Sequence, residues 1–233
     1  MAKAINRLLL SSSQHSQLIE SRKFLSDEEP NLKNLDLIIE CVAEDFNLKV
    51  EILEKIRKFN KSAIISSSTS SLSIADLQEK ISFDEKFLGI HFMNPPSQIN
   101  VVELVPTKYS DPVIVDSVDL WLSYIGQEVV LTQDNPGFLV NALLFTMFNR
   151  AGYMLDNSNA TASEIDLLMV SVSGHKIGPF RTMDLIGIDT CKVILENLHS
   201  KDPLFNLQPA NIFEEMISKG ALGRKTRNGF YKY

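Results

Sequence analysis

Two titratable side chains lie inside segments that otherwise have the apolar character of buried strands. His91 is near the end of the segment 87–92, and Glu103 is inside the next apolar segment, 101–105. A carboxylate within an apolar strand is costly unless it is paired. The strand–turn–strand layout could bring Glu103 to one nitrogen of His91, which leaves the other nitrogen free to take or give a proton. The pattern indicates an acid–base pair, and a hydrogen-bonded structural histidine is the alternative.

Two further polar side chains could bind a substrate oxygen. Ser70 follows a short strand expected at 63–65, and side chains at the carboxyl end of a parallel strand point into the ligand crevice. Asn141 lies one turn into an otherwise apolar helix, where a buried amide needs partners. A serine turn that caps the next helix is the alternative for Ser70, and capping of a neighbouring element is the alternative for Asn141.

These residues belong to a chain in which strands and helices alternate between residues 35 and 131, as is typical of an α/β sheet. Strands are expected at 35–42, 63–65, 87–92, 101–105 and 128–131, and helices at 2–20, 47–60, 74–81 and 112–125. A further set of helices without strands is expected at 138–156, 163–173, 182–199 and 210–219. The sequence therefore predicts an α/β domain over 1–133 and an all-α domain over 134–233.

The composition is that of an ordinary globular chain that is large enough to bury its own core. The 233 residues are 44% hydrophobic and 22% charged. The net charge of -6 argues against nucleic acid or an anionic membrane as a partner. We expect neither an export signal nor a membrane span. Cys41 and Cys191 have no disulfide or metal-ligand spacing, so we expect a cytoplasmic protein without a metal site.

Several segments together resemble the L-3-hydroxyacyl-CoA dehydrogenase family. The resemblance covers about residues 22–233, with the segments in the family's order and at matching spacing. These segments are Thr69–Leu72, Gly89–Pro95, Val102–Val105, Pro136–Asn141, Gly178–Phe180, Asp184–Thr190, Gly223–Thr226 and Gly229–Tyr231. The resemblance implies an NAD-dependent enzyme that interconverts L-3-hydroxyacyl-CoA and 3-ketoacyl-CoA, and a homodimer formed through the helical C-terminal domain.

The resemblance also implies a role for each matching polar residue. His91 would take the proton of the substrate's 3-hydroxyl, and Glu103 would orient His91 and stabilise its charged form. Ser70 and Asn141 would bind the substrate oxygen or the thioester carbonyl, and Asn94 would contact the substrate. Cofactor contacts are implied for Glu44, Lys49, Ser70 and Lys225. For the three charged residues of that set, a solvated surface charge is the alternative.

The sequence departs from the family pattern at its N-terminal end. The family opens with a strand and a G-x-G-x-x-G loop that binds the pyrophosphate, but the first glycine of this sequence is Gly89. We therefore expect a truncated Rossmann-like domain without its first βαβ unit, with dimerisation, domain exchange or the helix at 2–20 covering the exposed sheet. Two smaller departures are Ala142, where the family has a basic residue, and Arg150, where it has an acidic one.

Two other functions are compatible with these departures. A family remnant without cofactor could act as a binding or scaffold protein, with the acid–base residues inherited but unused. A relative could also act on another hydroxy acid or on an acyl group bound to a carrier. Binding of NADH distinguishes the first of these alternatives from a dehydrogenase.

Overall fold

A computed structural model describes residues 35–82, 85–201 and 208–233 of the chain. The chain forms two compact units, Met1–Phe138 and Leu139–Tyr233. The helix expected at 2–20 lies outside the described residues. Over the part of the chain that is described, no helix combines the length and the hydropathy needed to cross a membrane.

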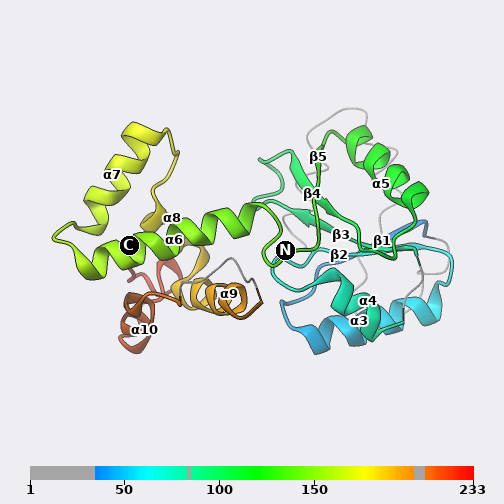
Figure 1. The fold of residues 1–233 in the computed structure, drawn as a ribbon, viewed down its shortest axis with the longest axis horizontal. Coiled ribbons are helices and arrows are strands. Elements are labelled where there is room, and N and C mark those ends of the chain that lie inside the picture. The colour runs from blue at the N-terminus through cyan, green and yellow to red at the C-terminus, as the bar shows by residue number, and fades with distance from the viewer. Residues whose placement is uncertain (1–34, 83–84, 202–207) are drawn as a thin grey trace. The chain divides into compact units, whose positions relative to one another are not determined.

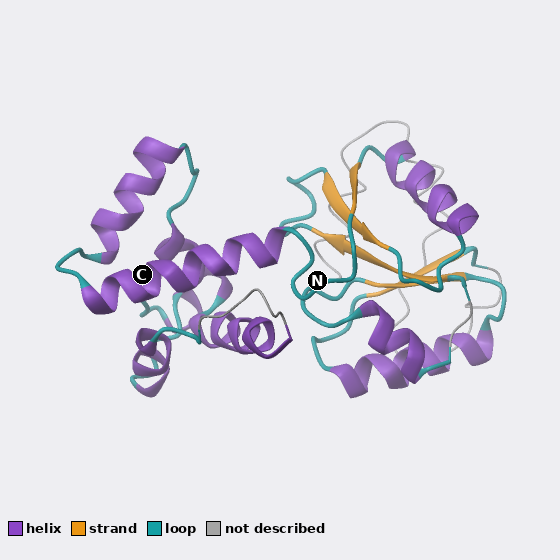
Figure 2. Ribbon diagram, viewed as in Figure 1, coloured by secondary structure: helices purple, strands orange, loops and turns teal. Residues whose placement is uncertain are grey.

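The first unit is built on a five-stranded sheet in the order β1-β2-β3-β4-β5 (Figures 1 and 2). The strands are β1 (Leu37–Glu40), β2 (Ile64–Ser67), β3 (Phe87–Phe92), β4 (Val101–Val105) and β5 (Glu128–Leu131). The pairs β1–β2, β2–β3 and β4–β5 are parallel, whereas β3 and β4 are antiparallel. The link between β3 and β4, residues 93–100, is shorter than the dozen or so residues that a parallel crossover needs. The predicted strands and the Rossmann-like character of the sheet are therefore confirmed, with one antiparallel pair.

Helices cover both faces of this sheet, as Figure 1 shows. α3 (Phe46–Phe59) and α4 (Ile74–Lys80) lie on one face, and α5 (Pro112–Tyr124) lies on the other. Each face has its own buried cluster, with Leu53 and Leu77 in the first and Leu122 in the second. Asp45, Ser73 and Asp111 cap the three helices by accepting from backbone N–H groups of the first turn. The apolar residues of the strands and helices thus form one buried cluster on each face of the sheet.

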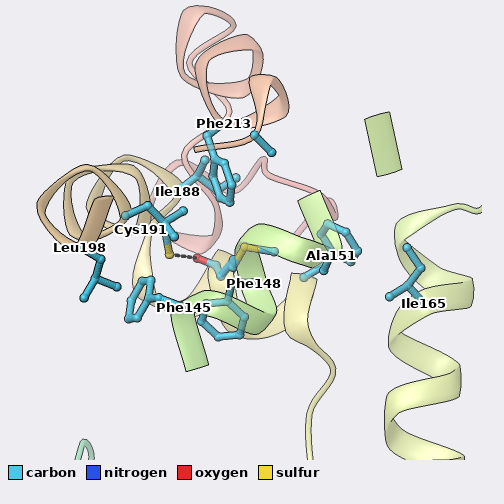
Figure 3. Packing of buried hydrophobic residues seen from close by; sticks show 12 residues of the cluster. Phe145, Phe148, Ala151, Ile165, Ile188, Cys191, Leu198 and Phe213 are labelled. Carbon is cyan, nitrogen blue, oxygen red and sulfur yellow. Dashed lines mark hydrogen bonds between the residues drawn. The ribbon is translucent and has the colours of Figure 1, made fainter. Parts of the chain in front are cut away.

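The second unit is helical, as the sequence predicted. Its elements are α6 (Val140–Asn157), α7 (Ala162–Ser173), α8 (Pro179–Ile186), α9 (Ile188–Lys201), α10 (Asn211–Ser218) and a short 3-10 helix, Arg224–Thr226. Figure 3 shows its core, in which Phe145, Phe148 and Phe213 pack around the buried Cys191. The Cys191 sulfur lies 4.0 Å from the carbonyl oxygen of Met183, and its burial raises the pKa of the thiol to about 12. Cys191 is therefore a packing residue in this core.

The prediction of one helix over 182–199 was wrong, because two helices, α8 and α9, occupy this region. Gly187 separates them and has a φ of 106°. Its N–H donates to Met183 at 2.8 Å and ends α8, while its carbonyl accepts from Cys191 at 2.9 Å in the first turn of α9. The apolar periodicity continues across the break, so the pattern alone did not reveal it. Glycine allows the break because it adopts positive φ without a steric penalty.

Two buried carboxylates hold the C-terminal segment of this unit on α8. Asp184 accepts from the N–H groups of Phe230 and Tyr231, each at 2.9 Å, and from the Tyr233 hydroxyl at 3.1 Å. Asp166 accepts from the Tyr231 hydroxyl at 2.8 Å and also caps the start of α8. The close approach that results leaves no room for a side chain on Gly223 or Gly229.

Gly223 provides a test of this close approach. Its φ is 95°, and a Cβ at this position would lie 2.4 Å from the backbone oxygen of Asp184. Gly220 also has a positive φ, 67°, but a Cβ there would meet nothing within 4 Å. We expect Gly220→Ala to cost about 1 kcal/mol of unfolding free energy through backbone strain alone, and Gly223→Ala about 3 kcal/mol, because overpacking adds to the strain of a φ and ψ of 95° and -151° that essentially only glycine adopts. Urea unfolding followed by circular dichroism measures both, and equal losses would show that the approach of Asp184 carries no cost.

Candidate active site

His91 and Glu103 are direct cross-strand neighbours on β3 and β4. The antiparallel register pairs the two residues, and the Nδ1 atom of His91 lies 2.7 Å from Oε2 of Glu103. Their side chains are only 7% and 4% exposed, so the pair is shielded from water. The carboxylate accepts, so we assign the proton of the neutral ring to Nδ1, which leaves Nε2 as the proton acceptor. The predicted contact is confirmed, and its geometry is that of a general base with an orienting carboxylate.

Phe138 packs near His91, and Asn94 lies in the turn after the strand that carries His91. The Phe138 ring, at the end of the first unit, has its centroid 5.5 Å from that of His91 and limits the space around the imidazole. Asn94 lies two residues after the end of β3 and is exposed, in the turn that reverses the chain toward β4. Its position after the strand that carries His91 makes it a candidate substrate contact.

Ser70 lies in a short loop at the carboxyl end of β2, residues 68–73, which we call the serine loop. Since β2 and β3 are parallel and Ser67 pairs with Gly89, the serine loop and His91 lie at the same edge of the sheet. The serine-rich turn does cap α4, as the alternative expected, but the capping residue is Ser73 and not Ser70. Ser70 therefore stands at the edge where ligands of open α/β sheets bind.

Two carboxylates from outside the serine loop hold it in place. Glu44 Oε1 accepts from the Thr69 hydroxyl at 2.6 Å and from the N–H groups of Ser70 and Ser71 at 2.8 and 2.9 Å. Asp134 accepts from the Ser73 hydroxyl at 2.9 Å and from two N–H groups at the start of α4. The sequence analysis did not identify Asp134. The loop conformation thus depends on side chains that lie far from it in sequence.

Lys49 is buried, so the alternative of a solvated surface charge is wrong for this residue. Its ammonium lies 2.9 Å from Glu40 Oε1, 3.2 Å from the Val42 carbonyl oxygen and 3.5 Å from Glu44 Oε2. Glu40 is a further residue that the sequence analysis missed, although it lies in an apolar strand in the same way as Glu103. The ammonium faces protein oxygens rather than solvent, and its side chain is 1% exposed.

The residues around Glu44 lower its pKa, and this makes the stability of the folded chain depend on pH. Partial burial acts to raise the pKa of the carboxyl, but the hydrogen bonds from the serine loop and the charge of Lys49 outweigh it and hold the pKa below its ordinary 4.5. A group whose pKa is lower in the folded chain stabilises the fold at pH values above its unfolded pKa. This stabilisation is lost as the pH falls from the ordinary pKa of the carboxyl through its lower pKa in the folded chain.

We therefore expect Glu44→Gln to destabilise the chain at neutral pH, and the difference from the wild type to shrink as the pH falls below 4.5. Urea unfolding at a series of pH values measures this difference. Glu51→Gln is the matched control: the ion pair with Lys55 on the surface of α3 also lowers the pKa of Glu51, but both side chains are exposed, so we expect a smaller pH-dependent difference than for Glu44→Gln. A difference between wild type and Glu44→Gln that stays constant down to acid pH would contradict the assignment.

Two further predicted site residues belong to the second unit. Asn141 is half-buried in the first turn of α6. Lys225 forms an ion pair with Asp189, with Nζ 2.5 and 2.6 Å from its two carboxylate oxygens.

Arg150 is exposed, and the buried polar residue of this part of α6 is Asn149, which binds the backbone of residues 208 and 210. Asn149 thus joins α6 to the segment that leads into α10.

The first unit offers part of a dinucleotide site. The carboxyl ends of β1, β2 and β3 meet at one edge, and this edge carries Glu44, the serine loop and His91. The sequence before Gly89 contains no glycine-rich pyrophosphate loop, so the polar residues at this edge could hold only the part of a dinucleotide that lies near His91. A Rossmann-like unit with an acid–base pair at this edge, followed by a helical unit, defines the class of two-domain nicotinamide-dependent dehydrogenases.

Comparisons with known proteins agree with this class. Residues 1–135 match the NAD binding domain of 3-hydroxyacyl-CoA dehydrogenase, and residues 137–233 match the C-terminal domain of the same family. The mitochondrial hydroxyacyl-coenzyme A dehydrogenase of Rattus norvegicus is 32% identical over 210 residues, which cover 89% of this chain and 67% of the relative. A 3-hydroxybutyryl-CoA dehydrogenase of Bradyrhizobium diazoefficiens is 34% identical over 91% of this chain and 73% of the relative.

Solved structures give the same result. The (S)-3-hydroxybutyryl-CoA dehydrogenase of Ralstonia eutropha has a TM-score of 0.82 and 36% identity, over 87% of this chain and 72% of that one. The chain therefore belongs to the 3-hydroxyacyl-CoA dehydrogenase family.

Proposed function

We propose that this chain catalyses the NAD-dependent interconversion of an L-3-hydroxyacyl-CoA and the corresponding 3-ketoacyl-CoA. The observation that carries the proposal is the buried contact of 2.7 Å between His91 and Glu103 at the ligand edge of the sheet. The names of the relatives, which act on hydroxyacyl-CoA or 3-hydroxybutyryl-CoA, support the substrate class. In this proposal residues 1–133 form the part of the nucleotide-binding domain present here, and residues 134–233 form the substrate and dimerisation domain.

The acid–base pair supplies the proton transfer of this reaction. When bound, NAD supplies the acceptor for the hydride that leaves C3 of the hydroxyacyl group. His91 Nε2 takes the proton of the 3-hydroxyl as the C–H bond breaks, so the alcohol becomes a ketone and the imidazole becomes an imidazolium. Glu103 stabilises this positive charge through its contact with Nδ1. In the opposite direction His91 returns the proton to the oxygen of the forming alcohol.

The remaining polar residues of the site have binding roles in this proposal. Ser70, Asn94 and Asn141 bind the oxygen atoms of the substrate and fix the direction of attack. The cofactor side comprises Glu44, Lys49, Ser70 and Lys225. Because the Lys49 ammonium is enclosed by protein oxygens, it acts on this side through Glu44 rather than by direct contact.

We further propose that the protein is a cytoplasmic homodimer formed through the helical unit. Exposed apolar side chains on this unit support an interface, among them Leu143, Leu167, Leu168 and Val172. Both cysteines are free thiols, as a reducing compartment favours. Light scattering tests the dimer, and a monodisperse monomer would contradict it.

Titration with NADH followed by its fluorescence, together with turnover of acetoacetyl-CoA, tests the proposed activity. We expect saturable NADH binding and loss of NADH absorbance when acetoacetyl-CoA is added. Failure to bind NADH at millimolar concentration would refute the dehydrogenase proposal for this chain and favour a binding protein. NADH binding without turnover of acetoacetyl-CoA would refute the substrate and favour another hydroxy acid.

A further inference from the structure

Glu40 is a buried carboxylate at the carboxyl end of β1 that the proposed chemistry does not use. Its side chain is fully shielded from solvent. Oε1 accepts from the Val42 N–H at 2.6 Å and from Lys49 at 2.9 Å, while Oε2 accepts from the Ser67 hydroxyl at 2.6 Å. A buried ion pair with so many partners requires an explanation, because an apolar pair of similar volume would often be as stable.

The partners of Glu40 lead to the serine loop. Lys49, held by Glu40, also lies 3.5 Å from Oε2 of Glu44. The other oxygen of Glu44 accepts from the hydroxyls of Thr69 and Ser71 and from the N–H groups of Ser70 and Ser71. The Glu40 carbonyl oxygen also accepts from the Ser68 N–H at 2.8 Å, where β2 passes into the serine loop. Two connections, one through side chains and one through the backbone, therefore join Glu40 to the residues around Ser70.

The charges explain why the connection needs Glu40. An ammonium group buried without a counter-charge is strongly disfavoured, and the Glu40 carboxylate, 2.9 Å away, supplies this counter-charge to Lys49. The charged ammonium then holds one oxygen of Glu44, so that the other oxygen stays directed at the serine loop. Without Glu40, the Lys49 charge has Glu44 as its remaining carboxylate partner among the described residues and competes with the loop for it.

We propose that Glu40 is a positioning residue that acts through Lys49 and Glu44 to hold the serine loop, and with it Ser70, at the ligand edge of the sheet. The proposal rests on the proposed function for the role of Ser70, but the connection itself is a property of the fold. Glu40 contacts neither substrate nor cofactor in this arrangement. Its effect on turnover is therefore indirect and passes through the conformation of the loop.

Amide hydrogen exchange of the full chain, followed by NMR, tests this proposal without requiring activity. In Glu40→Gln we expect exchange protection of the Ser70 and Ser71 amides to fall by about tenfold, the factor for about 1.4 kcal/mol, which is typical of a hydrogen bond to a charged acceptor. The amide of Ile90 in the centre of β3 serves as the internal reference. Glu51→Gln, an exposed ion-pair variant on the same helix as Lys49, is the control and leaves both amides protected.

The double variant Glu40→Gln/Lys49→Met distinguishes a role of Glu40 in positioning the serine loop from a role in the stability of the fold alone. It removes both buried charges, so we expect the thermal midpoint to recover toward the wild-type value while the Ser70 and Ser71 amides remain unprotected. We also expect kcat for acetoacetyl-CoA to stay about tenfold below the wild type in this variant. If the exchange protection of the serine loop recovers together with the thermal midpoint, the proposal is overturned and Glu40 has only a structural role. If the wild type itself shows no turnover, the proposed function fails alone, and the exchange comparison still decides the role of Glu40.

Discussion

Replacement of His91 by asparagine is expected to lower the turnover of acetoacetyl-CoA by about 10² to 10⁴, the range that a positioned general acid–base group contributes. Asparagine places an amide N–H near the position of Nδ1, so it can still donate to Glu103, which lies 2.7 Å from that atom in the wild type. It has no counterpart of Nε2 that can exchange a proton with the substrate. The variant thus removes the acid–base function and leaves the buried carboxylate with a donor.

Steady-state kinetics and an NADH titration measure this expectation together. We expect the affinity for NADH and the thermal midpoint to change little, because asparagine keeps a hydrogen bond to the buried Glu103. His175→Asn is the matched control, since His175 lies in the link between α7 and α8 of the helical unit. Turnover that is equal in the wild type and in His91→Asn would identify His91 as a structural histidine and remove the observation that carries the proposed function.

The sheet could be predicted from the sequence because its signals are local. Apolar segments bounded by polar turns predicted β3, β4 and β5 with the observed bounds. The break at Gly187 could not be predicted in this way, since the apolar residues on either side keep the helical spacing. One backbone dihedral angle decides that break, and hydrophobic periodicity carries no information about it.

The acid–base pair could be predicted because topology alone brings it together. A turn too short for a crossover makes β3 and β4 antiparallel neighbours, and the register then pairs His91 with Glu103. The burial of Lys49 depends instead on which face of α3 meets the sheet. Lys49 shares helical spacing with Leu53 and Ile56, but this sign of burial entered neither the expected cofactor contact nor the alternative of a solvated surface charge. Its partners could not be predicted, because Glu40 and Glu44 reach it from β1 and from the loop that follows.

Replacement of Glu103 by glutamine is expected to lower turnover by about 10² to 10⁴ without changing the affinity for NADH. The glutamate carboxylate can only accept, and this fixes the proton of the imidazole on Nδ1. A glutamine amide can either accept from Nδ1 or donate to it, and in the second arrangement the proton moves to Nε2, where the substrate proton should go. Glutamine also lacks the negative charge that stabilises the imidazolium formed in the reaction.

Long-range proton–nitrogen NMR spectra of the His91 ring show which nitrogen carries the proton, so they separate this mechanism from simple loss of packing. We expect the wild-type ring to be protonated on Nδ1 and the ring of Glu103→Gln to be divided between the two tautomers. Glu128→Gln is the matched control, because Glu128 is an exposed glutamate on β5, the neighbour of β4. Reduced turnover with an unchanged tautomer would assign the effect to the lost charge, whereas unchanged turnover would show that Glu103 only occupies a buried position. Since His91 and Glu103 act as a unit, the double variant is expected to lose little more than His91→Asn alone, and additive losses would contradict a shared proton-transfer role.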